Sequence, residues 1–417
     1  MTVKATPPLR NPAWAPFEHR DFALYFVSRF FSGASSQMIN VAVGWLIYDL
    51  TESAFALGLI GLCIFAPNII FALIAGHVAD RFDRRLVLII CYAAMTVSSL
   101  GLLTGVMTRT LSVTMIFLLI GLLGTAKAFS NPAGQAILPN LVPRDIFPRA
   151  VATMSWAWQT ATIAGPAVGG LLYAFGADKV FFATTILNSA CLICLVLLKP
   201  GLRVRSKEPV TWEYLTAGVR FIWGHQILLG SISLDLFAVL LGGATALLPI
   251  YARDILETGP SGLGVLRTAP AVGAFATGLV LAHMPELRQV GRKMFIAVAV
   301  FGLATIGFGL ATNFYAAMIF LAVLGAADMV SVFIRSTLMQ IETPDEMRGR
   351  VSAVNTLFIG ASNELGEFES GILAGFVGAV PAVVIGGVGS LVVTGLWTVW
   401  FPQLRDRDRL TQGPHKP

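Results

Sequence analysis

The chain contains twelve stretches of mostly apolar residues, each about as long as a membrane-crossing helix, and this repetition constrains the fold more than any other feature. A helix needs about 20 apolar residues to cross the hydrocarbon core, because each residue advances it by about 1.5 Å. The stretches lie near residues 21–48, 54–78, 85–107, 111–139, 147–175, 179–198, 226–251, 260–283, 293–311, 314–340, 350–377 and 380–401. The sequence therefore predicts an all-α membrane protein with twelve transmembrane helices.

Composition favours the same class. Of 417 residues, 56% are hydrophobic and only 12% are charged, about half the charged fraction of a soluble domain. The net charge of +6 comes from basic residues in short loops, so we expect a lipid bilayer and no nucleic acid as partner. The four cysteines, Cys63, Cys91, Cys191 and Cys194, lie inside apolar stretches and are interpreted as small hydrophobic residues, with no metal site.

Lysine and arginine are distributed unequally between alternate loops. Loops on the side of both termini hold 22 of the 29 basic residues, and the opposite loops hold three, Arg109, Lys179 and Arg253. Because cytoplasmic loops carry the basic excess, both termini are predicted to be cytoplasmic. No cleavable signal peptide is apparent in the first seventeen residues, so we expect the first span to direct insertion.

A long polar segment, residues 199–225, divides the stretches into two sets of six. The predicted organisation is a cytoplasmic tail over 1–20, a six-helix bundle over 21–198, a cytoplasmic linker over 199–225, a second six-helix bundle over 226–402 and a tail over 403–417. Within the linker, apolar residues from Trp212 to Trp223 recur at helical spacing. Two alternatives stay open for this part, an interfacial amphipathic helix and a plain surface linker.

An internal repeat with an offset of 201 residues supports two related halves. It aligns Leu123-Gly124 with Leu324-Gly325, Pro143 with Pro344, Arg149 with Arg350, and Gly165 and Gly170 with Gly366 and Gly371. A constant offset over about fifty residues is typical of membrane transporters built from two copies of one helical unit. The two bundles are therefore expected to be pseudo-symmetric.

The decapeptide from Gly76 to Arg85 resembles the loop signature of the major facilitator superfamily. Residues that match the signature are Gly76, Ala79, Asp80, Arg81, Arg84 and Arg85. Val78 stands where the pattern has Leu, and Asp83 where it has a second Gly. The resemblance implies two six-helix bundles that rock about a central site. It also implies a cytoplasmic gate in which Asp80 is latched by Arg149 or by the start of the eleventh span near Arg350.

Several other segments resemble the efflux branch of that superfamily, which includes exporters of the enterobactin type. They are Asn131 to Ala133, Leu138 to Pro143, Arg149 to Ala152 and Asn363 to Gly371. In the fifth span, Gly165 to Gly170 resembles a Gly-Pro element of exporters, in which proline bends a helix and glycines allow close contact. The expected helix-packing residues are Gly165, Pro166, Gly169, Gly170, Gly366 and Gly371. An ordinary packing role for this element remains an alternative.

Charged side chains inside the spans are the candidates for function, because an ionised group at the bilayer centre costs about 2.5 to 3.5 kcal/mol even on insertion scales. The carboxyl groups that could bind and release protons are Glu364, Glu367, Asp235 and Asp328, in that order. The residues expected to line a cavity are Arg29, Lys127, Arg335, Trp156 and Phe237. Arg267 is a further charge within a span. Lys127 and Asp328 occupy repeat-equivalent positions and could meet across the pseudo-two-fold axis.

The sequence thus predicts a secondary active transporter, a proton-coupled exporter of a small organic solute of drug or siderophore type, working as a monomer in the bacterial inner membrane. An enzyme is not expected, because the chain has no His-x-x-x-His and no Gly-x-Ser-x-Gly, so no catalytic residues and no cofactor are assigned. Two alternatives stay open, namely an importer of the same fold and a non-transporting receptor or lipid-handling membrane protein. The coupling ion could be sodium instead of the proton.

Overall fold

The regular structure is helical throughout the part of the chain that is described. The structure is a computed structural model that describes residues 14–199, 212–284 and 287–410, except for the side chains of Leu73, Asp80 and residues 212–215. Within these ranges the β-type pairing is limited to an isolated bridge between Arg288 and Arg409. The predicted all-α class is confirmed.

Six long helices precede the linker. After the short turn η1 (Ala15–Glu18) they are α1 (Arg20–Thr51), α2 (Ala54–Arg81), α3 (Arg84–Met107), α4 (Val113–Ile137), α5 (Phe147–Ala174) and α6 (Ala177–Val196), with η2 (Leu138–Asn140) between α4 and α5. Polar side chains cap several of them, because the first N–H groups of a helix lack intrahelical partners. Ser53 caps α2, Asp83 caps α3 and Ser112 caps α4.

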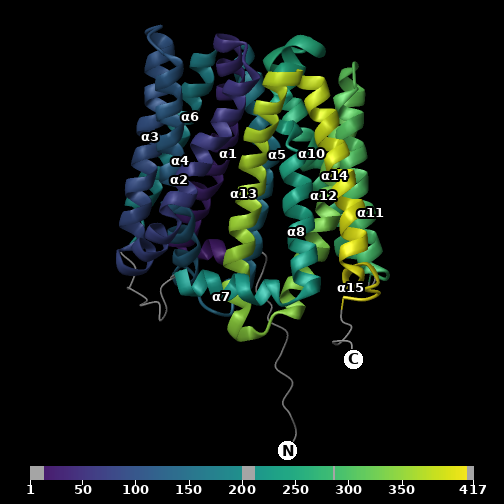
Figure 1. The fold of residues 1–417 in the computed structure, drawn as a ribbon. Coiled ribbons are helices and arrows are strands. Elements are labelled where there is room, and N and C mark those ends of the chain that lie inside the picture. Colours follow the sequence, from purple (N-terminus) through teal and green to yellow (C-terminus); the bar gives the residue numbers. More distant parts are fainter. Residues whose placement is uncertain (1–13, 200–211, 285–286, 411–417) are drawn as a thin grey trace, which may run out of the picture.

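The second part of the chain starts with α7 (Trp212–Trp223). It continues with α8 (Gln226–Leu241), η3 (Ala244–Leu247), α9 (Leu248–Ile250), η4 (Tyr251–Ile255), α10 (Gly259–His283), α11 (Val290–Gly309), α12 (Phe314–Glu342), α13 (Asp345–Val377), α14 (Ala379–Trp400) and α15 (Pro402–Arg405). In Figure 1 the elements η1, α7 and α15 lie at one end of the molecule, which we call the α7 end. The opposite end, where α1 finishes and η4 lies, is called the far end.

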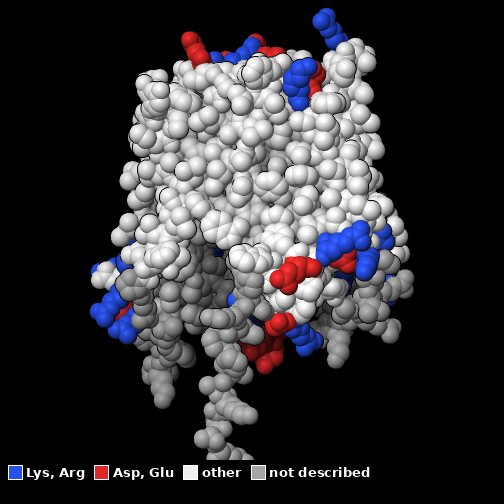
Figure 2. Space-filling model, turned by 180° about the vertical axis from the view of Figure 1, so that it is seen from behind, with Lys and Arg blue, Asp and Glu red and all other residues white. Residues whose placement is uncertain are grey.

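Nine helical segments of the described chain are long and apolar enough to cross a membrane. Three further long helices, α1, α5 and α13, have 32, 28 and 33 residues but carry more polar side chains. Lys, Arg, Asp and Glu gather at the two ends of the face shown in Figure 2 and leave a broad uncharged band between them. The chain is therefore a multi-pass membrane protein, and the count of twelve spans stays a prediction.

The stretch predicted as one span over 226–251 is interrupted. Helix α8 ends at Leu241, and Gly242 and Gly243 separate it from η3, α9 and the π-helical turn η4. A Cβ on Gly243 would collide with the carbonyl of Gly366 in α13, so glycine allows α13 to approach the break. Broken helices inside membrane proteins are tolerated where they are covered by protein or line a cavity.

Glycines permit close contact between helices from the two parts of the chain. A Cβ on Gly371 of α13 would lie 2.5 Å from the Cα of Gly58 in α2, and a Cβ on Gly170 of α5 would lie 2.7 Å from the Cα of Gly264 in α10. Gly165 packs on Gln37 of α1, and its repeat partner Gly366 packs on Leu240 of α8. Small residues favour such backbone contact in lipid, where no hydrophobic effect drives helices together.

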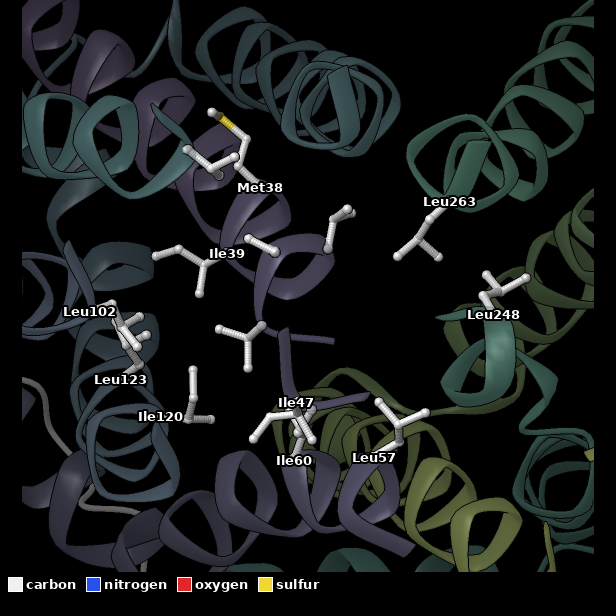
Figure 3. Close-up of a cluster of buried hydrophobic side chains, with 14 of the residues drawn as sticks. Met38, Ile39, Ile47, Leu57, Ile60, Leu102, Ile120, Leu123, Leu248 and Leu263 are labelled. Atoms are coloured by element: carbon white, nitrogen blue, oxygen red, sulfur yellow. The ribbon is translucent and has the colours of Figure 1, made fainter. Parts of the chain in front are cut away.

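The far end is also joined by a large apolar cluster, which includes Ile47, Leu57, Leu123, Leu248 and Leu263. Figure 3 shows side chains of α1 to α4 on one side of this cluster and Leu248 and Leu263 on the other. At the α7 end, α7 lies against α8 and α13. Its Ile222 is buried in a cluster with Leu228 and Val351. The polar linker therefore leads into a helix that packs on protein.

Two glycine substitutions in α13 test the seam between α2 and α13. Gly371→Ala places a methyl group against the backbone of Gly58, so we expect a loss of about 1 to 3 kcal/mol of stability, the usual cost of overpacking. Gly360→Ala meets no atom within 4 Å and should be neutral or stabilise by up to about 1 kcal/mol, because alanine is the better helix former. Thermal unfolding in detergent compares the two. Equal melting temperatures for the two variants would contradict the close contact.

Candidate functional site

A buried ion pair lies at the centre of the second half of the chain. Nη1 of Arg335 in α12 lies 2.6 Å from Oδ2 of Asp235 in α8, and the side chains are only 4% and 6% exposed. Such a pair persists in a low-dielectric interior because each charge offsets the desolvation cost of the other. Asp235, predicted as a proton carrier, therefore has a direct cationic partner.

A cavity of about 330 Å³ adjoins this pair. Its polar lining includes Asp235, Asp328, Arg335, Asn363 and Glu367, and the break after α8 contributes Gly242 and Gly243. Arg335 and Asp235 both act electrostatically on Asp328. The cavity thus brings together three of the four predicted proton carriers, and two of them, Asp235 and Asp328, interact with the Arg335 guanidinium.

Glu367 in α13 connects this cavity to the first half of the chain. It also lines a smaller space of about 30 Å³ with Asn40 and Gly44 of α1 and with Arg267 of α10. The nearby cations that interact electrostatically with the Glu367 carboxyl group are Arg267 and Lys127. Within the described chain the buried Nε of Arg267 has no hydrogen-bond partner, so this guanidinium depends on charge interactions at longer range.

Lys127 in α4 completes a four-charge group. The carboxyl groups that interact electrostatically with Lys127 are those of Glu364 and Glu367. Among the described residues, no salt bridge within 4 Å joins Lys127 or Arg267 to either of these carboxyl groups. We call Lys127, Arg267, Glu364 and Glu367 the central quartet. The suggestion that Lys127 could meet Asp328 is not what the structure shows, because the ammonium group faces α13 while Asp328 lies beside Arg335 on α12.

Arg29 of α1 lies in a separate cavity of about 370 Å³ formed with α4 and α5. Trp158, Gln135, Gln159 and Ser155 contribute to its wall. The hydroxyl of Tyr25 donates a hydrogen bond of 2.7 Å to the carbonyl of Gly134 and so joins α1 to α4 beside the cavity. The predicted cavity-lining positions of Arg29 and Arg335 agree with the two larger cavities, and Lys127 lines a space of about 20 Å³.

Two aromatic residues predicted to line a cavity, Phe237 and Trp156, pack against other aromatic rings. Phe237 packs against Trp397 of α14, with ring centroids 5.4 Å apart. Trp156 packs edge-on against Phe275 of α10, at 5.7 Å. Neither side chain belongs to the lining of the two larger cavities. The rotation of a helix about its axis decides which side chains face a cavity, because a shift of one residue rotates a side chain by about 100°. Trp158, two positions after Trp156, lines the 370 Å³ cavity.

The arginines of the loop signature bind helix ends in the first half. Arg84 donates from Nη1 to the carbonyl of Ala136 in α4 at 2.8 Å, and Arg85 donates from Nε to Leu195 in α6 at 3.1 Å. The last carbonyls of a helix lack intrahelical partners, so these contacts cap α4 and α6. Arg81 is exposed, and Gly76 lies in the last turns of α2.

The proposed partners of Asp80 lie at the starts of α5 and α13. The Asp80 side chain is outside the described part of the structure, so its latch to Arg149 or Arg350 stays a prediction. Arg149 is the third residue of α5. Arg350 lies in α13, and its carbonyl would be 2.8 Å from a Cβ on Gly218 of α7. Helix α7 therefore packs directly on the segment that the sequence assigns to the gate.

The far end carries an ionic cluster that the sequence did not reveal. Arg253 in η4 lies 3.1 Å from Glu52 and 3.6 Å from Asp49 at the end of α1, and it stacks over the ring of Tyr48. The Tyr48 hydroxyl also donates a short hydrogen bond to Asp254. The sequence signal that could have indicated this cluster is that Arg253 is one of only three basic residues in the loops opposite the termini, where Asp49 and Glu52 also lie. This cluster joins α1 to η4 and adds to the apolar contact at the far end.

The arrangement suits transfer of ions and solute more than bond chemistry. Carboxyl groups beside cavities can gain and lose protons as their access to water changes. No group of three or more His, Cys, Asp or Glu side chains in the described chain could hold a metal ion. The carboxyl groups beside the cavities are thus suited to charge movement.

Comparison with known proteins agrees with this geometry. A family model described as transmembrane secretion effector, a branch of the major facilitator superfamily, matches residues 11–416. The enterobactin exporter EntS of Escherichia coli O81 (strain ED1a) is 26% identical over 395 residues, with 93% of each chain covered. The protein of that name from Shigella boydii serotype 18 shows the same identity and coverage.

Solved structures resemble the fold at low identity. The nucleoside transporter NupG matches with a TM-score of 0.71 and 12% identity, over 91% of this chain and 99% of that one. An inward-facing, occupied bacterial homologue of the human lysosomal transporter Spinster matches with a TM-score of 0.67 and 15% identity, over 97% and 100%. Because identities are this low, these structures establish the fold alone.

The Asp235–Arg335 pair predicts a stability pattern. Arg335→Met leaves Asp235 and Asp328 together without a cation, so we expect a loss of about 3 to 5 kcal/mol. Asp235→Leu should cost less, because Asp328 remains as a carboxylate near Arg335. The double variant should recover part of the loss seen in Arg335→Met, because it removes one of the two carboxyl groups that this variant leaves without a cation, whereas Asp328 stays. Denaturant unfolding in mixed micelles measures all three, and additive losses in the double variant would contradict the pairing.

Proposed function

The chain belongs to the transmembrane secretion effector family of the major facilitator superfamily, and from this premise we propose that it exports a small organic solute in exchange for protons across the bacterial inner membrane. Support for export comes from curated relatives, which are enterobactin exporters matched over 93% of this chain. The substrate of those relatives is not carried over, because the residues that select it are not known from a match at 26% identity.

We further propose an architecture of twelve membrane helices in two pseudo-symmetric bundles, α1 to α6 and α8 to α14, with the α7 end in the cytoplasm. The repeat-equivalent contacts of Gly165 on α1 and Gly366 on α8 support it. So do the paired seams α2–α13 and α5–α10. We also propose that the chain acts as a monomer.

The observation that carries the proposal is the central quartet. Its members come from α4 in the first bundle and from α10 and α13 in the second. These residues interact electrostatically across the boundary between the bundles, although they form no ion pairs within 4 Å. A change in the protonation of Glu367 or Glu364 therefore alters the attraction between the bundles. Proton binding and bundle rocking are thus coupled through one set of charges.

The driving force is sufficient for such a cycle. A membrane potential of about 100 mV supplies roughly 2.3 kcal/mol for each elementary charge that crosses the membrane. Glu367 is the first candidate carrier, because it borders both the large cavity and the quartet. Glu364, Asp328 and Asp235 follow. The signature loop would stabilise the outward-open state at the α7 end, with Asp80 as its anchor.

Uptake into everted membrane vesicles tests the proposal. Vesicles are energised and offered a panel of fluorescent lipophilic dyes and siderophores. Wild type should show uncoupler-sensitive uptake, and Glu367→Gln should fall to the level of vesicles that lack the protein, because an amide cannot carry the proton. Glu369→Gln is the matched control, since Glu369 lies two residues away on another face of α13, where it accepts a hydrogen bond from Ser370 and no cation of the described residues acts on it.

Three outcomes are distinguishable. Equal loss in both variants would indicate a folding defect and would be checked by the amount of monodisperse protein. Unchanged uptake in Glu367→Gln would remove Glu367 from the coupling role. Accumulation together with protons in vesicles of the native orientation would show an importer of the same fold instead of an exporter.

A further inference from the structure

Arg29 differs from the other intramembrane cations in its electrostatic surroundings. Arg335 has Asp235 at 2.6 Å, and Lys127 and Arg267 have Glu367 as a nearby carboxylate. The groups that interact electrostatically with Arg29 are the phenols of Tyr25 and Tyr92 and the thiol of Cys191, and none of these is a carboxylate. Throughout the described chain, no carboxylate lies within salt-bridge distance of Arg29. Within the described residues, its charge is therefore not matched by a carboxylate.

The cavity beside Arg29 shows the same imbalance. Its volume of about 370 Å³ lies in the range of pockets that hold small organic ligands. Among the described residues of its lining, Arg29 is the one charged residue and none is acidic. The 330 Å³ cavity of the second half is lined by three carboxyl groups and one guanidinium. The two cavities are thus opposite in formal charge.

An unmatched guanidinium inside a membrane protein is costly unless a partner of opposite charge arrives. We infer that the cavity beside Arg29 binds an organic anion, namely a carboxylate that carries an aromatic ring. The inference deepens the proposed function, on which it rests, by naming the chemical class of the exported solute. A guanidinium group presents two parallel N–H donors that match the two oxygens of a carboxylate.

The rest of the wall fits the remainder of such a solute. Trp158 of α5 offers an aromatic surface for a flat ring, and Met154 and Leu138 add apolar contact. The side chains of Gln135 and Ser155 supply hydrogen-bonding groups around the carboxylate of the solute. A cationic solute would instead meet the Arg29 charge in a low-dielectric space, which opposes its binding.

This placement separates solute from protons. The anion binds between α1, α4 and α5, whereas the carboxyl groups that exchange protons lie on α8, α12 and α13. The two ligands then communicate through the central quartet and the motion of the bundles. Direct contact between solute and proton carrier is not needed.

Equilibrium binding of three matched probes tests the inference without any ion gradient. The probes are 1-naphthoate, its neutral amide 1-naphthamide, and the cation 1-naphthylmethylammonium, measured by calorimetry on the purified full-length protein. Wild type should bind naphthoate at least about tenfold more tightly than either other probe, the effect of a charge-assisted hydrogen-bonded pair. Arg29→Gln should lose that preference while retaining a monodisperse, folded protein, and Arg29→Lys should keep part of it.

Arg109→Gln is the control, because it removes a basic residue at an exposed turn outside the cavity. It should leave the preference for naphthoate unchanged. The inference is overturned if wild type does not prefer naphthoate, or if Arg29→Gln retains the preference. If the preference depends on Arg29 but everted vesicles show no proton-driven uptake, the binding site stands and the proposed export fails.

Discussion

The cost of placing charge in the membrane interior is the constraint on which the rest of this structure depends. An ionised side chain near the bilayer centre needs a partner, water or a ligand. Asp235 and Arg335 satisfy each other directly, the central quartet is balanced at longer range, and no carboxylate of the described residues acts on Arg29. We assign a different role to each of these three cases. The Asp235–Arg335 pair holds helices together, the central quartet can respond to proton binding, and Arg29 can bind an anion.

The helix contacts are compatible with movement between two arrangements. At Gly58–Gly371 and Gly170–Gly264 the helices meet backbone to backbone, so no interdigitated side chains have to be withdrawn when they tilt. At the far end, the apolar cluster and the contacts of Arg253 hold the two halves together. Exposed ion pairs such as these each contribute less than about 1 kcal/mol, so they can open without a large barrier.

Much of the fold was predictable because the length of each apolar stretch by itself indicates a helix that can cross the membrane. The repeat offset also paired Gly165 with Gly366, and these glycines lie against α1 and α8, respectively. The interruption after Leu241 was missed, although Gly242, Gly243 and Pro249 gave a local signal. The site was less predictable, because the partner of Lys127 and the orientations of Trp156 and Phe237 depend on helix rotation. The capping contacts of Arg84 and Arg85 depend on carbonyl groups more than fifty residues away, which no local pattern encodes.

The central claim is that solute flow drives proton flow in the opposite direction through Glu367. Purified protein is reconstituted into liposomes that contain 1-naphthoate and a trapped pH indicator, and these are diluted into naphthoate-free buffer at equal pH. The account predicts acidification of the interior that depends on the protein, is abolished by Glu367→Gln and is retained by Glu369→Gln. Protein-free liposomes should show the opposite change, because naphthoate leaks out as the neutral acid and takes a proton with it. Protein-dependent naphthoate efflux without acidification, or with alkalinisation of the interior, would contradict it.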